Sequence, residues 1–466
     1  MGGGRLRRLA RPAGLAALVL ILIVANFARA SADSSNEDGD GGDHQGSSSR
    51  QEAEFSVGVE GCESETVSPS SARRWGSEQV QTTGSTTSDI ALMEGDYSSS
   101  ASIWTTRRGE SWISGTWELD PDASTGTISG YFWGRAGADD AGVLVVGSGD
   151  GALEGVDVGF VAQADDDAEA GSCDDGFVLS GHGLASRPRP DVPDGMVVVE
   201  STKSFETTLG DLTGALDANP NIGIVATVNH QAGAASRDLV LPPTTEVFFG
   251  NPALGTPLMQ ASQSTGIDLP QKMLVWTDLL GDVQVGYNAP SYLAGRHDLD
   301  SDTPQLSVVA GALANFAGVA TGTVVEPVFS AGGPSAGDGL VVVPSNHSVD
   351  DTAAALVAAL DAAPPINVVL TLDHDANAAN AGLALNPTRL IVFGNPSLGT
   401  PLMQTNRAVA LDLPQKMLVI EDDAGNVSVL YNDPAYVADR HDVRGQDDIV
   451  NTITGALANF SAGATS

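Results

Sequence analysis

Hydrophobic and polar residues alternate in short segments along the first half of the chain, and Gly, Asp and Pro separate these segments. The ranges 111–119, 126–133 and 156–161 have the two-residue period of a half-buried strand. Turn residues such as Asp120-Pro121-Asp122 stand between them. We therefore predict an all-β domain, a barrel or a sandwich, over residues 54–186. The aromatic residues expected to fill its core, or alternatively to line a ligand cavity, are Trp112, Trp117 and Trp133.

The second half of the chain contains an internal duplication. Residues 195–316 match residues 339–460 at a constant offset of 144, without a gap. The segment 268–275 recurs unaltered as 412–419. A period of this length indicates tandem domains rather than a solenoid. The predicted units are a first α/β repeat at 192–318, a linker at 319–337 and a second α/β repeat at 338–466.

The same order of elements is predicted in both repeats. In the first, a strand at 196–200 and a helix at 205–218 precede a strand at 222–228. A strand at 246–249 then leads into a turn, and we predict that the next helix has Thr256 as its N-cap and Pro257 as its first residue. The remaining predicted elements are strands at 272–277 and 282–287 and helices near 291–296 and 305–317.

These repeats resemble a known family. The residues that carry the resemblance are the His230 strand end, Phe249-Gly250-Asn251-Pro252, Gly255-Thr256-Pro257-Leu258-Met259 and Leu269-Pro270. They are similar to those of the bacterial and archaeal family catalogued as domain of unknown function 302. The resemblance implies that each repeat is an α+β sandwich, with helices on a mainly antiparallel sheet, and it implies no established reaction. It also implies that the two repeats pair within the chain as a pseudo-dimer.

The net charge of the chain limits its possible binding partners but says little about its fold. The chain has 22 Lys and Arg against 59 Asp and Glu, a formal net charge of −37. Such a charge repels phosphate backbones, so we expect no nucleic-acid partner. It is typical of proteins from high-salt habitats, where counter-ions screen an acidic surface. The only lysines are Lys203, Lys272 and Lys416.

The N-terminus has the order of a secretory signal. Arginines precede an apolar stretch at 14–27, and Ala28-Arg29-Ala30 follows. The stretch is shorter than the roughly 20 residues that span a bilayer. We therefore predict a signal peptide over 1–30 and a secreted or cell-envelope protein; an uncleaved segment, which would place the chain at a membrane, is the alternative. The polar, acidic residues 31–53 predict a disordered linker.

Two cysteines are present, Cys62 and Cys173. An oxidising compartment favours a disulfide between them; two free buried thiols are the alternative. A zinc-type ligand set would need further ligands at suitable spacing. We therefore expect neither a metal nor a cofactor.

Two pairs of repeated residues are candidates for acid–base chemistry. His230 and His374 follow predicted strands, and aspartates flank His374, which would raise the pKa of its imidazole if the carboxylates lie close. Lys272 and Lys416 each open a predicted strand and could act as electrostatic partners. The structural alternatives are a histidine bonded to a loop and a lysine in a buried ion pair.

Other repeated residues are candidates for binding a small ligand or an anion. Tyr292, Arg296 and His297 could together bind a carboxylate or phosphate, or Arg296 could pair with an acid of its own domain. Asn251 and Thr256, at a predicted helix start, could hold an anion, or could simply form the turn and cap the helix. The equivalent residues of the second repeat are Asn395, Thr400, Tyr436, Arg440 and His441.

The sequence contains none of the signatures Gly-x-Ser-x-Gly, His-Glu-x-x-His or Cys-x-x-Cys. Our first hypothesis is therefore a secreted, salt-adapted protein that binds a small molecule in two related pockets or serves as a scaffold. The second is a hydrolase- or lyase-like enzyme that uses His230 and His374 as acid and base. The third is a structural cell-envelope protein.

Overall fold

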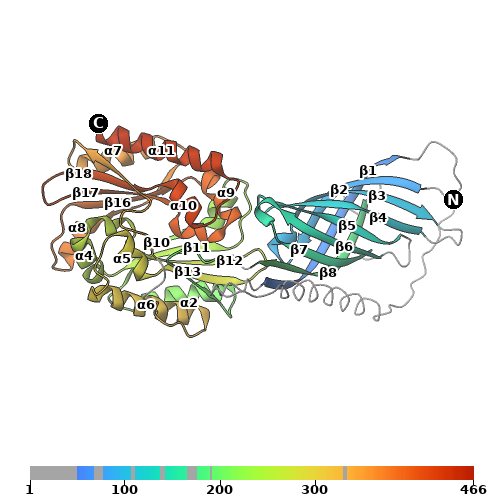
Figure 1. Cartoon of the computed structure of the whole chain (residues 1–466), viewed down its shortest axis with the longest axis horizontal. Helices are drawn as coiled ribbons and strands as arrows, with labels where there is room; N and C mark the ends of the chain where they lie inside the picture. Colours follow the sequence, from blue (N-terminus) through green and yellow to red (C-terminus); the bar gives the residue numbers. More distant parts are fainter. Residues whose placement is uncertain are drawn as a thin grey trace, which may run out of the picture. The chain divides into compact units, whose positions relative to one another are not determined.

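The structure is a computed structural model of the chain, shown in Figure 1. It describes residues 50–67, 77–105, 111–136, 142–164, 176–188, 191–328 and 333–466. The predicted signal peptide and Cys173 lie outside these residues. The chain divides into two compact units, of which the first holds the β-rich domain and the second holds both repeats. No helix within the described ranges is both long enough and apolar enough to cross a bilayer.

The first unit is a closed barrel of eight strands, each antiparallel to its neighbours, and β1 pairs with β8 to close it. This confirms the predicted all-β domain. The barrel starts earlier than predicted, because Arg50 pairs with Pro188 of the last strand and forms an ion pair of 2.7 Å with Asp157. Its strands are β1 (Arg50–Val67), β2 (Ser77–Ser88), β3 (Gly95–Thr105), β4 (Ser111–Pro121), β5 (Thr127–Ala136), β6 (Gly142–Asp150), β7 (Asp157–Ala164) and β8 (Gly176–Pro188).

Alternate residues of these strands fill the barrel. Phe160 is buried in this core, and its ring centroid lies 5.9 Å from that of Phe55 and 6.2 Å from that of Trp117. Trp117 is thus in the core, as predicted. Trp112 and Trp133 are 37% and 47% exposed and face outward, so their expected place in the core is wrong. The alternation defines two faces of a strand but does not say which of them the barrel encloses.

Each repeat contains a five-stranded antiparallel sheet, and the predicted α+β class is confirmed. The order is β10-β11-β12-β13-β9 in the first sheet and β14-β18-β17-β16-β15 in the second. The first repeat consists of β9 (Met196–Glu200), α2 (Phe205–Asp217), β10 (Gly223–Asn229), α3 (His230–Ala235), β11 (Thr244–Gly250), α4 (Pro252–Ala261), η3 (Gln263–Ile267), β12 (Gln271–Thr277), β13 (Val283–Asn288), α5 (Pro290–Arg296) and α6 (Pro304–Thr321). The second consists of β14 (Leu340–Ser345), α7 (Val349–Asp361), β15 (Asn367–Asp373), α8 (His374–Asn380), β16 (Thr388–Gly394), α9 (Pro396–Thr405), η4 (Arg407–Asp412), β17 (Gln415–Glu421), β18 (Val427–Asn432), α10 (Pro434–Arg440) and α11 (Asp447–Thr465).

The predicted start of the helix after β11 is wrong. Helix α4 begins at Pro252, and the Asn251 side chain caps it by accepting a hydrogen bond of 2.9 Å from the N–H of Ala253. Asn251-Pro252 supplies the same cap-and-proline signal as Thr256-Pro257, five residues earlier, and the earlier signal prevails. Helix α6 also continues to Thr321, into the predicted linker, and ends at Gly322 with φ 76°.

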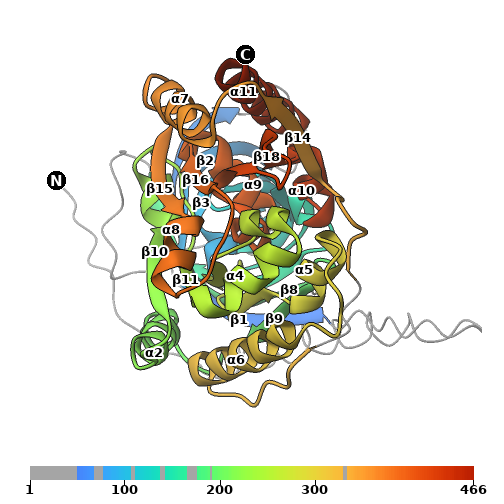
Figure 2. The same ribbon diagram turned by 90° about the vertical axis from the view of Figure 1, so that its left-hand side faces the viewer.

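The two repeats pack with their sheets face to face, so the second unit has the layer order helices, sheet, sheet, helices (Figure 2). In the first repeat α2 and α6 cover the outer face of the sheet. The inner faces meet in a core that includes Phe248 and Ile267 of the first repeat and Leu390, Val392 and Leu418 of the second. Short helices also pack across the contact, α3 against α9 and α4 against α8.

Shortening one inner-face side chain tests this core. Leu418 is 0% exposed and packs against Gly266 of the other repeat. We expect Leu418→Ala to lower the free energy of unfolding by about 2–5 kcal/mol, because it leaves a cavity between the sheets. Val342→Ala, at a residue 56% exposed on β14, should change it by less than about 0.5 kcal/mol. Urea unfolding followed by circular dichroism in high salt measures both; equal midpoints would contradict the face-to-face packing.

Candidate functional site

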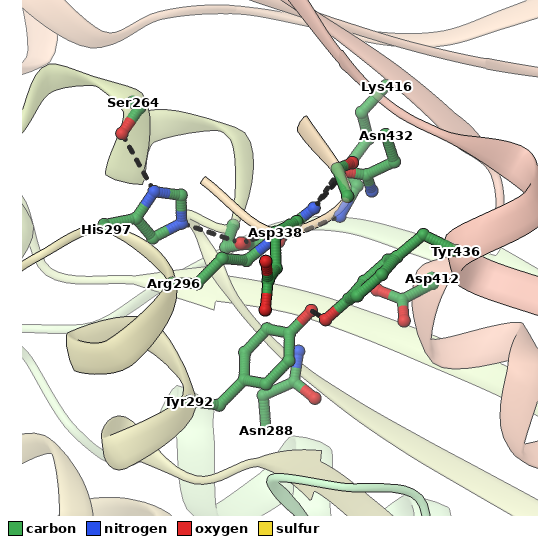
Figure 3. Close-up of polar contacts among 12 residues, drawn as sticks. Ser264, Asn288, Tyr292, Arg296, His297, Asp338, Asp412, Lys416, Asn432 and Tyr436 are labelled. Atoms are coloured by element: carbon green, nitrogen blue, oxygen red, sulfur yellow. Dashed lines mark hydrogen bonds and ion pairs between the residues drawn. The ribbon is translucent and has the colours of Figure 1, made fainter. Parts of the chain in front are cut away.

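The repeated charged residues meet in one buried cluster between the two sheets, part of which Figure 3 shows. Their side chains are at most 4% exposed. We call this set the buried ion cluster. It consists of Glu246, Asp268, Lys272, Arg296 and His297 from the first repeat and Asp412, Lys416, Arg440 and His441 from the second.

Asp268 is the centre of the first half of the cluster. Its Oδ2 accepts hydrogen bonds of 2.8 Å from Arg296 and 2.9 Å from Nε2 of His297. Its Oδ1 lies 3.4 Å from Nζ of Lys416, which belongs to the other repeat. Burial by itself would raise the pKa of Asp268, but the charges of Arg296 and Lys416 hold it well below its usual range. The carboxylate is therefore ionised and fully compensated inside the protein.

Asp412 is the equivalent centre in the second half. Its Oδ2 accepts hydrogen bonds of 2.6 Å from Arg440 and 2.8 Å from Nε2 of His441. Lys272 does not complete the symmetry, because its Nζ lies 3.2 Å from Glu246 and donates to the carbonyl of Leu411. The second repeat has a leucine where the first has Glu246. Oδ1 of Asp412 consequently has no hydrogen-bond partner within the described part of the chain.

Both arginines join the two repeats. Arg296 donates to Oδ1 of Asn432 at 2.9 Å, and Arg440 donates to Oδ1 of Asn288 at 2.7 Å. Each arginine also donates to a backbone carbonyl just before the first strand of the other repeat. Arg296 donates to Asp338 at 3.0 Å, and Arg440 donates to Asp194 at 3.2 Å and 3.0 Å.

Two tyrosines lie beside these arginines. The hydroxyls of Tyr292 and Tyr436 approach to 3.5 Å, as Figure 3 shows, and Arg440 lies 3.9 Å from the ring centre of Tyr292. In the predicted anion site of Tyr292, Arg296 and His297, the guanidinium and imidazole N–H groups thus donate to acceptors of the protein itself. The contacts match the alternative, in which Arg296 pairs with an acid of its own domain.

The lysines of the cluster are in the buried ion pairs named as the structural alternative. Burial and the neighbouring charge of Lys272 together lower the pKa of Lys416 to about 8. Burial also raises the pKa of Glu246 to about 8. Such values suit proton transfer, but no substrate can reach these side chains unless the two sheets separate. The geometry gives the cluster a role in holding the repeats together.

The two histidines directly follow strands β10 and β15, as predicted, and each is the first residue of a short helix, α3 or α8. Nε2 of His374 donates to the carbonyl of Gly266 at 3.2 Å. Burial lowers the pKa of His230 and of His374 to about 4, and Asp375 raises that of His374 only in part. The expected rise in the pKa of His374 is therefore wrong: Asp375 pairs with Arg389, and desolvation of the imidazolium outweighs the nearby charge.

A pocket of about 170 Å³ lies beside His230. It combines candidates from opposite repeats, because His230 of the first repeat lines it together with Asn395 and Thr400 of the second. Nε2 of His230 and Oγ1 of Thr400 are both buried and have no hydrogen-bond partner among the described residues. The rest of the lining is mainly apolar and includes Phe393, Leu398, Met403, Leu413, Leu457 and Phe460.

Of the remaining predicted binding residues, the asparagines have structural roles, because the Asn251 and Asn395 side chains cap α4 and α9. Thr256 lies inside α4, and its hydroxyl is buried without a hydrogen-bond partner among the described residues. The expected anion site at Thr256 is absent from the described structure, because the helix starts earlier and its first N–H groups belong to the Asn251 cap. Sequence reasoning missed Glu246, although a charged residue within the apolar strand β11 was a usable signal.

One asymmetry of the cluster can be tested with two matched substitutions. Nδ1 of His297 bonds with the hydroxyl of Ser264 at 2.9 Å, whereas Nδ1 of His441 is unpartnered in the described structure and the equivalent residue is Ala408. We expect Ser264→Ala to lower the free energy of unfolding by roughly 1 kcal/mol and Ala408→Ser to raise it by a similar amount. Thermal and urea unfolding measure both, and shifts in the same direction would contradict the hydrogen-bond assignment.

Comparison with known proteins finds relatives that match part of the chain. The chain is 42% identical over 165 residues to the proteins named fluoride-specific ion channel FluC 1 of Brucella suis and of Brucella abortus. Each alignment covers 34% of this chain, and 65% and 61% of these two relatives, so the chain spans less than two thirds of their length. A crystal structure of an uncharacterised conserved DUF302 protein from Bacillus stearothermophilus covers 28% of this chain and 99% of its own, with 17% identity and a TM-score of 0.26.

The family match covers both repeats. The family described as domain of unknown function DUF302 matches residues 197–315 and 341–460, just over half of the 466 residues. These limits agree with the duplication and with the two five-stranded sheets. The chain belongs to the DUF302 family and contains its domain twice.

Proposed function

We propose that this protein is exported and binds a small, uncharged, mainly apolar molecule in the pocket beside His230. The observation that carries the proposal is a mainly apolar pocket whose lining includes His230 and Thr400, two side chains that each have a buried polar atom, Nε2 and Oγ1, without a hydrogen-bond partner among the described residues. The buried ion cluster serves this function by fixing the two repeats together, since the pocket draws its wall from both.

The pocket's chemistry limits the ligand class. A buried polar atom without a partner costs about 1–3 kcal/mol, so a ligand that supplies the missing hydrogen bond offsets that cost. An apolar cavity of about 150 Å³ in another protein holds benzene, and this pocket has about 170 Å³. With a pKa of about 4, His230 is neutral near pH 7 and offers no charge to a ligand. The class that fits is a single ring with one hydroxyl or carbonyl group.

The equivalent place in the first repeat differs. There His374 is the equivalent of His230, but its Nε2 already donates a hydrogen bond to the carbonyl of Gly266. We therefore propose one binding pocket of this type rather than two. The same contact argues against paired acid–base catalysis by His230 and His374, and the buried lysines are out of reach of a substrate.

Export, a disulfide and salt adaptation belong to the same proposal. The signal-like N-terminus and the net charge of −37 support a protein that works outside the cell in salt. Cys62 lies in β1 opposite Gly176 of β8, and Cys173 precedes Gly176 by three residues in the sequence. This register supports a Cys62–Cys173 disulfide across the β1–β8 seam of the barrel.

Phenol and benzene are suitable probes of the pocket. We expect both to raise the unfolding temperature of the protein, and Thr400→Val to weaken phenol binding about tenfold, with little effect on benzene. Thr256→Val, the matched change in the first repeat, should leave both affinities unchanged. Phenol affinity should stay constant from about pH 8 to about pH 5.5 and fall near pH 4, where His230 gains its proton. Calorimetric titration measures these values; no phenol binding at millimolar concentration would refute the proposal.

Mass spectrometry tests export and the disulfide together. Protein recovered from the medium or envelope should begin at Ser31, and a non-reducing digest should contain a peptide pair linking Cys62 to Cys173. The Cys62→Ser, Cys173→Ser double variant should lose about 4–5 kcal/mol of barrel stability, because an unfolded loop of this length is no longer closed. An intact Met1 would establish the uncleaved alternative, and two free thiols would exclude the disulfide.

A further inference from the structure

The outer face of the barrel has a shallow pocket of about 640 Å³ that spans β2 to β6. Its floor is built from two rows of outward-facing residues that run across the strands in register. The first row consists of Gln81, Ser100, Thr116 and Tyr131, and the second of Thr83, Ser98, Glu118, Ser129 and Ser148. The face is therefore rich in hydroxyl groups and carries one carboxylate.

Three exposed aromatic side chains continue from this pocket. Tyr131, Trp133 and Trp112 are 66%, 47% and 37% exposed, and they are the exposed aromatics among the side chains that the structure describes. Tyr131 and Trp133 are two residues apart on β5, so they lie on the same face about 7 Å apart. Trp133 is opposite Ser114 of β4, which places Trp112 diagonally next to it. The three rings form a stripe beside the hydroxyl rows.

The barrel does not need these rings for its core. Trp117, Phe55 and Phe160 already pack in the interior, where the ring of Phe160 contacts the other two. The in-register neighbours of Tyr131 and Trp133 on β6 are Val146 and Leu144. Large aromatic side chains kept in water, between apolar residues and rows of hydroxyl groups, are typical of a binding surface. The hydroxyls beside them can both donate and accept hydrogen bonds.

Charge decides between the possible occupants. The lining has a single charged residue, Glu118, and no cation. A chain with a net charge of −37 repels polyanions such as nucleic acids and acidic polysaccharides. A neutral polysaccharide matches the face, because its hydroxyls pair with the Ser and Thr rows while the apolar faces of its sugar rings stack on the aromatic stripe. We propose that this outer face of the barrel binds neutral polysaccharide.

Native gel electrophoresis in gels that contain a polymer tests the proposal with the full chain. The probes are hydroxyethylcellulose, galactomannan and dextran, with alginate as the polyanion. At least one neutral polymer should retard the protein, and alginate should not. Absence of retardation by all three neutral polymers, or retardation by alginate alone, would overturn the proposal.

Substitutions then locate the site. We expect Tyr131→Ala and Trp133→Ala each to weaken binding about tenfold, whereas Gln163→Ala, at an exposed residue of β7, should retain it. Circular dichroism verifies that the variants fold.

Unchanged retardation of both aromatic variants would overturn the assignment. So would a change in oligomeric state on Trp133→Ala, measured by sedimentation, because the stripe would then be a contact between two copies. Phenol binding should persist in every barrel variant, so the two proposals fail independently.

Discussion

Two buried carboxylates, Asp268 and Asp412, determine how the second unit is assembled. A charge removed from water is tolerated only when it is paired and hydrogen-bonded, and each of these carboxylates receives an arginine and a histidine of its own repeat. The arginines reach asparagines of the other repeat. Separating the sheets would leave these groups without partners, and breaking such a pair typically costs about 3–5 kcal/mol. The cluster therefore fixes the register of the repeats as well as their contact.

The duplication has no gap, but only about half of its aligned residues are identical, and the interactions of the two copies differ as well. Glu246 attracts Lys272 away from Asp412, while Lys416 remains beside Asp268. His374 bonds to Gly266, whereas Nε2 of the equivalent His230 is unpartnered in the described chain. His374 is thus hydrogen-bonded within the protein, whereas His230 lines a pocket. A single chain with two repeats can diverge in this way, because each half of the interface is encoded separately.

The acidic surface and the cationic interior are complementary features. The net charge of −37 makes lysine rare, and two of the three lysines lie in the buried ion cluster. Lys203 also forms an ion pair, at 2.7 Å from Asp211. All three lysines therefore lie next to a carboxylate. We attribute the scarcity of lysine to the proposed high-salt environment rather than to the chemistry of a site. The lining of the outer pocket of the barrel, by contrast, includes a single charged residue, Glu118.

The sequence by itself determined the β domain, the two α/β repeats and their family, because strand and helix periods and the duplication are local patterns. For Lys272 and Arg296 it left two roles open, an ion pair or a contact with a ligand or substrate, and the structure shows the ion pairs. Tertiary structure decided that His230 and Thr400 of opposite repeats share a pocket, that burial lowers the pKa of His374 despite Asp375, and that Trp112 and Trp133 face outward. The shared pocket, the lowered pKa and the outward-facing rings all depend on which side chains are buried. Burial is set by the packing of segments that are distant in the sequence.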